Sequence, residues 1–415
     1  MIERLCERFG IGGRVRDAAL RAQTRIAGVA YDAQREVAGS VLQAFVDEGI
    51  ADSDLSGSTG YGYDDPARAR YESLLARIFG AERALARLSI VSGTHAIVTA
   101  LAACAPPGTT LLSISGRPYD TLRNAICDAP YSLVRQGTAY VEIELLADGT
   151  IDLGAVDRAL TTRPVAAVFV QRSRGYAPRR SLSIAQCERA IAAVKAAAPG
   201  AAVLVDNCYG ELVEAREPTH AGADLAMGSL IKNLGGSIAP AGGYVVGRAD
   251  LVERVAARLY APGLGTGLGP SLGYGRSFVQ GLFLAPLVIE QCLRGLDFAA
   301  ALFDELGYAV DPQPGQVRTD IVQAVRLGSP ERLVRFARGL QTAMPVNGRF
   351  APEPGPVPGY VDPVIMSGGA FVAGATIELS CDAPMRPPYE VYLQGGVTAA
   401  HAYLGALLAA RALAD

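Results

Sequence analysis

The chain has 415 residues, enough for two or three domains and a sizeable core. Half of its residues are hydrophobic and 19% are charged, which excludes a disordered chain. The formal net charge is −3 and no basic block is present, which argues against a nucleic acid partner. Seven scattered cysteines without a C-x-x-C pair indicate thiols in a reducing cytoplasm, and three widely separated histidines argue against a metal site.

At the N-terminus, residues 1–8 are charged and lack the apolar core of a signal peptide. The first 50 residues predict two helices. The second helix carries apolar residues at helical spacing: Ala38, Val41, Leu42, Phe45 and Val46. A polar, glycine-rich loop follows over residues 56–66. From Arg68 the pattern is helical again, and this helix ends at Gly80.

An uncharged stretch, residues 88–116, is interrupted by Pro106-Pro107-Gly108. The interruption leaves a helix from about Thr94 to Cys104, far shorter than the roughly 20 residues of a membrane span. A buried helix followed by a strand over residues 110–114 fits better. We therefore expect a soluble, cytoplasmic protein without membrane contact.

The centre of the chain alternates strands with helices. Residues 165–170 form a short apolar run, typical of a strand buried on both faces of a parallel sheet. The Ser183-x-x-Gln186 spacing is a capping box that opens a helix. A strand over 202–205 follows, then another helix, then a strand over 244–247. This alternation predicts a mostly parallel, doubly wound α/β domain.

A second α/β unit begins near Phe298 and ends in a helix from Thr398. We therefore divide the chain into an N-terminal helical segment (1–50), a large ligand-binding domain (51–297) and a small C-terminal domain (298–415).

In the stretch 228–236, Lys232 is flanked by Ser229 and by glycines, and the strand over 203–205 leads directly into Asp206. Pyridoxal 5′-phosphate (PLP) chemistry needs such a pair. The lysine amine bonds to the cofactor aldehyde, and the carboxylate keeps the pyridine nitrogen protonated. Lys232 is the charged residue in an otherwise uncharged run, so we expect desolvation to lower its pKa. Asp206 would lie beyond the carboxyl end of its strand, where α/β sheets bind ligands. The simpler alternatives are a surface lysine and an aspartate that caps a loop.

The segment Val91-Ser92-Gly93-Thr94-His95 precedes the helix that ends at Cys104. Ser92 or Thr94 can cap this helix, and the amides of Gly93 and Thr94 can bind the cofactor phosphate. The two interpretations are compatible. His95 is more typical of a packed polar residue than of a catalyst.

Three tyrosines are further candidates. Tyr61 and Tyr63 lie in a loop too polar for a core, where they can donate to a phosphate or pack at a subunit interface. Tyr119 follows a strand and can stack on a flat ring, or pack in the core.

A run of alternating glycines resembles a dinucleotide-binding motif, but it fits no G-x-G-x-x-G register and no strand leads into it, so we exclude a dinucleotide site. These glycines are Gly263, Gly265, Gly267 and Gly269.

Further motifs extend along nearly the whole chain: 58–65, 92–97, 118–122, 171–176, 205–211, 228–233, 377–380 and 394–396. Together they resemble the cysteine/methionine-metabolism group of fold-type I PLP enzymes, and within it the subfamily called aluminium resistance protein or methionine γ-lyase-like protein. The resemblance implies a PLP-dependent transferase-like fold with a large sheet domain and a smaller C-terminal domain.

By this resemblance Lys232 bonds to the cofactor, Asp206 pairs with the pyridine nitrogen and Tyr119 stacks on the ring, and Lys232 and Tyr119 are the expected catalytic residues. The residues that would hold the phosphate are Ser92, Gly93, Thr94 and Ser229.

The resemblance also implies residues beyond the cofactor. The loop with Tyr61 and Tyr63 would reach the phosphate of a neighbouring subunit, so we expect a homodimer or homotetramer with shared active sites. A guanidinium would bind the carboxylate of a small amino-acid substrate. Arg386 is the first candidate for this role, and Arg172 and Arg174 are alternatives.

The implied reaction is β- or γ-elimination from an amino acid, with γ-elimination favoured and a thiolate, or a halide, as the leaving group. An aminotransferase, a racemase and a non-catalytic resistance or binding protein are the alternatives. Residues 381–387 depart from the usual Ala-Asp-Gly-Pro-Leu-Arg-Glu pattern, and Leu234 and Ser237 stand where Pro and Gly are usual. These departures lie near the lysine and the carboxylate clamp, and they leave the substrate open.

Overall fold

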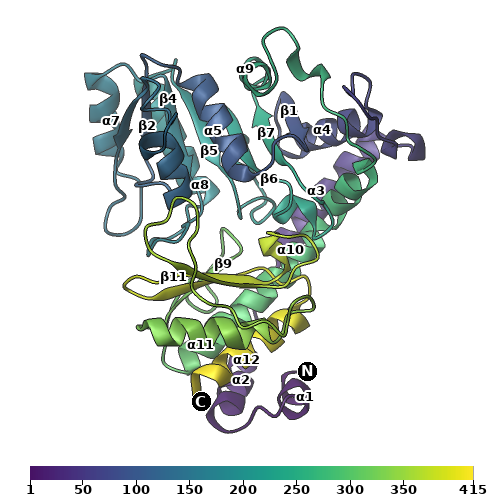
Figure 1. Ribbon diagram of the computed structural model, residues 1–415, viewed down its shortest axis with the longest axis vertical. Coiled ribbons are helices and arrows are strands. Elements are labelled where there is room, and N and C mark those ends of the chain that lie inside the picture. Colours follow the sequence, from purple (N-terminus) through teal and green to yellow (C-terminus); the bar gives the residue numbers. More distant parts are fainter. Residues whose placement is uncertain (415) are drawn as a thin grey trace.

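The computed structural model describes residues 1–414 and contains two β-sheets, each with its own helices. The larger sheet lies in the upper half of Figure 1 and the smaller one in the lower half, with both chain termini at the lower end. One helix, α10 (Gly275–Glu305), extends from the first half to the second. The expected boundary near residue 297 falls inside this helix, and the division into domains stays a prediction.

The large sheet has seven strands. In sheet order they are β1 (Arg83–Arg87), β7 (Gly243–Gly247), β6 (Leu225–Ser229), β5 (Ala202–Asp206), β4 (Ala167–Gln171), β2 (Thr110–Ser113) and β3 (Ala139–Glu142). The run from β6 to β3 is parallel, whereas β7 is antiparallel to both of its neighbours. The structure confirms the mostly parallel sheet, because short apolar strands such as 202–206 are buried on both faces.

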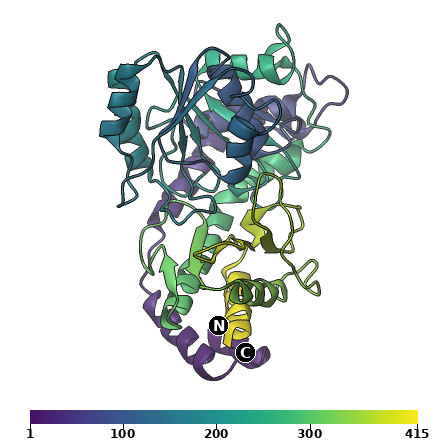
Figure 2. The same cartoon turned by 60° about the vertical axis from the view of Figure 1, so that its left-hand side comes forward.

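Helices cover both faces of this sheet (Figures 1 and 2). One face packs on α5 (Gly93–Cys104) and α9 (Ala249–Leu259). The opposite face packs on four helices: α7 (Leu153–Thr162), α8 (Ile184–Ala197), α4 (Pro66–Ile78) and the first half of α10. Ser183 and Gln186 form the expected capping box at the start of α8. The result is a three-layer α/β unit.

The small sheet is antiparallel and has five strands. In sheet order they are β10 (Val364–Gly368), β11 (Ser380–Pro384), β12 (Glu390–Gln394), β9 (Val322–Arg326) and β8 (Ala309–Asp311). One face packs on the second half of α10, α11 (Pro330–Gln341) and α12 (Ala399–Ala414). The other face carries Val322 and Tyr392 and meets Tyr176 and Tyr209 of the large-sheet half.

The expected helix count at the N-terminus is wrong. The first 50 residues contain three helices, α1 (Ile2–Arg8), α2 (Gly13–Arg25) and α3 (Asp32–Glu48), instead of two. Helix α3 buries Val37, Val41 and Ala44, so Leu42 and Val46 face outward and are 51% and 66% exposed.

The helix expected between residues 205 and 244 is replaced by turns and by strand β6. The apolar run from Leu225 to Ser229 is only five residues long, and it pairs with β5 and β7 along its length. Within the described residues 1–414, none of the helices combines the length and apolar character that a membrane span requires.

Candidate active site

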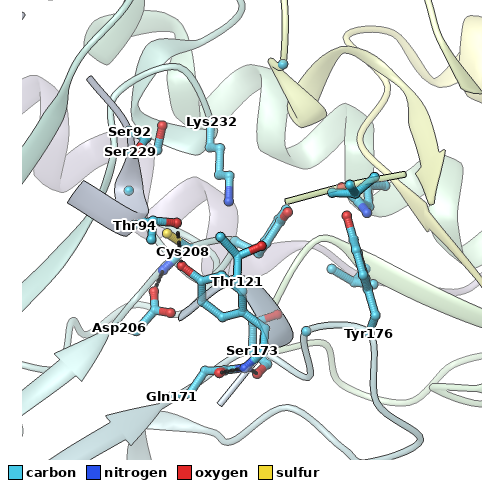
Figure 3. A pocket seen from close by; sticks show the side chains of 18 of the residues that line it. Ser92, Thr94, Thr121, Gln171, Ser173, Tyr176, Asp206, Cys208, Ser229 and Lys232 are labelled. Atoms are coloured by element: carbon cyan, nitrogen blue, oxygen red, sulfur yellow. Dashed lines mark hydrogen bonds between the residues drawn. The ribbon is translucent and has the colours of Figure 1, made fainter. Parts of the chain in front are cut away.

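A cavity of about 310 Å³ lies between the two sheets. The large-sheet half contributes the carboxyl ends of β4, β5 and β6 and the start of α5, and the small sheet contributes residues of β9, β10 and β12. Figure 3 shows Lys232 reaching toward the centre, with Ser92, Thr94 and Ser229 on one side and Asp206 below. The carboxyl ends of parallel strands are where this class of sheet binds ligands.

The structure brings the predicted lysine and aspartate to the same cavity. Asp206 is the last residue of β5 and is 3% exposed, and its Oδ1 accepts a hydrogen bond from the Cys208 amide at 3.1 Å. Lys232 follows the end of β6, at the neighbouring strand. Burial raises the pKa of Asp206, and the amide and the Lys232 ammonium oppose that rise. A protonated pyridine nitrogen would be a further cation for this carboxylate.

The expected lowering of the Lys232 pKa is wrong for the structure described. Desolvation does push this pKa down, but Cys208, Tyr209, Asp206 and Tyr119 outweigh it and raise the pKa well above its ordinary value. Lys232 therefore holds its proton firmly, and forming a bond to an aldehyde requires removing that proton.

The start of α5 opens onto the cavity. Ser92 caps the helix, because its Oγ accepts from the His95 amide at 3.1 Å. The first amides of a helix have no intrahelical partner, so those of Gly93 and Thr94 are suited to a phosphate. A Cβ added to Gly93 would lie 3.1 Å from Cys208 Sγ and 3.5 Å from the Ser229 amide nitrogen. A side chain at position 93 would therefore have to displace the Cys208 thiol by a few tenths of an ångström, and Ser229 lies beside this start of the helix and also lines the cavity.

Tyr119 also lines the cavity, and its hydroxyl shares a 2.7 Å hydrogen bond with Thr94 Oγ1. Its amide donates to Gln171 Oε1 at 2.9 Å, and Gln171 Nε2 donates to the Ser173 carbonyl at 2.9 Å. Burial raises the pKa of Tyr119 well above its ordinary value, so the phenol stays neutral. Gln171 thus fixes the loop that carries Tyr119, and sequence reasoning did not single it out.

The small sheet and Tyr176, which follows β4 of the large sheet, supply a second wall that the sequence did not reveal as part of the site. Tyr176 donates to Asp382 Oδ2 at 2.6 Å, and Gln394 Nε2 donates to the same oxygen at 2.9 Å. Tyr176 and Gln394 line the cavity, and Tyr176 stacks on Tyr392 with ring centroids 5.6 Å apart. Burial raises the pKa of Asp382, while the two hydrogen bonds and the Lys232 charge oppose the rise.

Apolar side chains from both halves also line the cavity. They are Ile231, Val322, Val357, Val364 and Met366.

None of the three candidate arginines lines the cavity formed by the described residues. Arg172 is fully buried, pairs with Glu214 and donates to Asn207 and Gly210, so its role in the structure is internal. Arg174 pairs with Asp311 at 2.6 Å.

Arg386 pairs with Asp120 at 3.0 Å and donates to the Tyr176 carbonyl at 3.3 Å. Both of these residues adjoin the cavity, because Tyr176 lines it and Asp120 lies between the lining residues Tyr119 and Thr121. Of the three arginines, Arg386 is therefore the one placed beside the site, and its substrate role stays a prediction.

Tyr61 and Tyr63 lie outside the cavity and are 76% and 61% exposed. Their loop is nevertheless held in place. Asp65 accepts from the amides of Ser58, Arg68 and Ser271 at 2.9, 2.9 and 2.6 Å. Two exposed tyrosines on a loop held by hydrogen bonds are available for a contact with another subunit. That contact stays a prediction.

Comparison with known proteins shows the family of the chain. The family model described as methionine gamma-lyase matches residues 16–414, so the chain belongs to the methionine gamma-lyase family. It is 44% identical over 365 residues to the uncharacterized protein YnbB of Bacillus subtilis (strain 168), covering 87% of this chain and 86% of YnbB.

Solved structures show the same likeness. A carbon-sulfur lyase involved in aluminum resistance from Clostridium novyi NT is 38% identical, with a TM-score of 0.93 and 98% of each chain covered. The pyridoxal-5′-phosphate dependent protein YhfS from Escherichia coli has a TM-score of 0.60 over 92% of this chain and 96% of its own. At 19% identity, YhfS shows only that the fold is shared.

Proposed function

We propose that the protein is a PLP-dependent lyase that eliminates a γ-substituent from an amino acid, with a thiolate as the default leaving group. The main observation behind the proposal is that Lys232, Asp206 and the start of α5 line the same cavity. Membership of the methionine gamma-lyase family and the likeness to a carbon-sulfur lyase support the reaction class.

The residues fit PLP on three structural grounds. Asp206 is a buried carboxylate on the cavity that a pyridinium would complement. The start of α5 opens onto the cavity with Ser92, Gly93 and Thr94, and Ser229 lines the cavity beside them, so free amides and hydroxyls are available to a phosphate. Lys232 supplies the amine. When bound, PLP supplies an electron sink that stabilises negative charge at the substrate Cα.

Each residue then has a definite task. Lys232 would take the proton from the substrate Cα and, once it has given that proton up to the bound cofactor, take one from Cβ, so that the γ-substituent can leave. Asp206 would keep a proton on the ring nitrogen, and the neutral Tyr119 would lie against the ring, held by Thr94 and Gln171. Arg386 would bind the substrate carboxylate by exchanging its contact with Asp120.

The wall beside Met366 favours an apolar side chain on the substrate, whereas Tyr176 and Gln394 offer polar contacts. Methionine and related thioethers match the apolar part. A γ-halo amino acid is a second substrate class that this wall can accommodate.

The test is product analysis with methionine, cystathionine, homocysteine and γ-halo amino acids. Release of a thiol, ammonia and a 2-keto acid supports the proposal. Conversion of the cofactor to pyridoxamine phosphate would indicate an aminotransferase, and exchange of the Cα hydrogen without loss of a leaving group would indicate a racemase. A purified protein that takes up no PLP would contradict the proposal and favour a non-catalytic role.

A further inference from the structure

Tyr209 is the residue whose ring lies against the Lys232 amine. It is half-buried on the turn after β5, and the Lys232 Nζ lies 3.8 Å from the centroid of its ring. An ammonium within about 6 Å of the face of an aromatic ring is attracted by the negative potential of that face. The contact joins two residues that both line the cavity.

The backbone of Tyr209 is in a conformation that only strong local contacts maintain. Its φ is 71°, in the left-handed region that a bulky residue rarely adopts. Its carbonyl accepts from Asn233 Nδ2 at 3.0 Å and from the Ile321 amide at 3.2 Å. Asn233 follows Lys232 in the chain, so the same side chain fixes the lysine's segment and the tyrosine's turn. Strained residues of this kind concentrate at functional sites.

Several other groups act on the Lys232 charge. Asp206, Cys208 and Tyr119 approach it from the large-sheet half, and Asp382 approaches it from β11. Glu211, in the turn after Tyr209, is a further acidic neighbour. A test of the ring must therefore leave all of these residues unchanged.

We propose that Tyr209 is a positioning residue whose ring face holds the protonated Lys232 amine in place before the amine reacts with an aldehyde. The ring stabilises the ammonium form, so it raises the pH at which the amine becomes reactive. The role in cofactor attachment rests on the proposed function, whereas the contact between ring and amine can be tested without any turnover.

The chain makes this test unusually clean, because Lys195 and Lys232 are its two lysines. Lys195 pairs with Asp224 at 2.6 Å, apart from the cavity, and serves as an internal control. The full-length protein, freed of cofactor, is treated with pyridoxal 5′-phosphate or with propanal and a reductant over a range of pH. Labelling of each lysine-containing peptide is then measured by mass spectrometry.

Tyr209→Phe keeps the ring and should label Lys232 with a pH midpoint close to that of the wild type. Tyr209→Leu removes the ring and should lower the midpoint by about one pH unit, because the ammonium loses its cation–π partner. The profile of Lys195 should be the same in all three proteins. An unchanged or raised midpoint in Tyr209→Leu, or an equal shift in Tyr209→Phe, overturns the proposal.

If Tyr209→Leu does not fold, a fluorinated phenylalanine at position 209 keeps the ring's shape and weakens the negative potential of its face. The midpoint should fall with this residue too, and an unchanged midpoint overturns the proposal. A ring-dependent midpoint with propanal but no labelling by pyridoxal 5′-phosphate would support the role of Tyr209 and contradict the proposed function.

Discussion

Asp206 shows how position in the fold gives a common residue a specific role. It ends a central strand, is 3% exposed and lines the same cavity as Lys232. Asp206→Asn keeps the shape but cannot hold a proton on a pyridine nitrogen by charge. We expect PLP to remain attached to Lys232 while kcat/KM for elimination falls about a hundred- to a thousandfold.

The control for this prediction is Asp224→Asn, because Asp224 is also buried but pairs with Lys195 and Arg248 away from the cavity. This variant should lose stability and keep its kcat/KM. Full activity of Asp206→Asn would remove Asp206 from the cofactor site.

Glu211 makes a prediction about pH and stability. Burial raises its pKa from 4.5 to about 8, and its Oε2 has no hydrogen-bond partner among the described residues. The native state therefore keeps a proton that the unfolded chain releases, and the free energy of unfolding falls as the pH rises through this window. Glu211→Gln should flatten this dependence and stabilise the protein at pH 8 by about 1–3 kcal/mol.

Denaturant titrations at several pH values measure this effect. Glu188→Gln changes an exposed glutamate that pairs with Arg216, and it should leave the slope between pH 5 and about 8 unchanged. A Glu211→Gln protein with the wild-type slope would show that Glu211 is ionised throughout.

At the scale of elements, the packing of α10 against the segment after Lys232 depends on glycine. A Cβ added to Gly281 would lie 2.4 Å from the Gly235 carbonyl oxygen. Gly281→Ala should therefore destabilise the protein by about 1–3 kcal/mol and weaken PLP binding, because it displaces the segment that carries Lys232.

Gly39 is the matched control for Gly281, since it lies in α3 with nothing within 4 Å of an added Cβ. Gly39→Ala should stabilise the protein by about 0.5–1 kcal/mol, because alanine is the better helix former. Thermal or denaturant unfolding of the two variants measures both effects. Equal stability of the two would contradict the close packing of α10.

The sequence predicted the elements that local patterns determine. The strand before Asp206, the capping box at Ser183 and the helix after Ser92 are all present. Sequence patterns did not predict which side of a helix is buried when tertiary packing determines it. In α3, the apolar Leu42 and Val46 face outward. A helix was also expected where β6 lies, because a five-residue apolar run does not distinguish the two elements by itself.

The residues of the candidate site likewise fall into those that the sequence predicted and those that it did not. Asp206 ends a strand, Lys232 follows one and Ser92 precedes a helix, so chemistry and local pattern indicated these three residues. Ser229 was assigned to the phosphate by the family resemblance. The hydrogen-bonded group of Tyr176, Asp382 and Gln394 was not found, because Tyr176 lies more than 200 positions before the other two and only the tertiary fold brings it to them.

At the scale of the whole molecule, we predict that active sites are shared between subunits. Tyr61 and Tyr63 are exposed and ordered, as residues that reach a neighbouring site would be. A double variant, Tyr61→Ala with Tyr63→Ala, should lose activity, as should Lys232→Ala. Mixed and refolded together, the two should recover roughly a quarter of wild-type activity, because half of the dimers are mixed and each has one intact site.

Complementation is read from activity against the fraction of mixed oligomer, measured with two distinguishable tags. No recovery despite mixed oligomers would show that each site is built from a single chain.

The central claim is that Lys232 is the amine that binds PLP. The direct measurement is to incubate the protein with PLP, reduce it with borohydride and identify the labelled peptide by mass. With Lys195 and Lys232 as its two lysines, the chain allows a clear assignment. We predict one pyridoxyl group on the peptide with Lys232, and none on that peptide in Lys232→Ala. Labelling of Lys195 alone, or no labelling of a folded protein, would contradict the account.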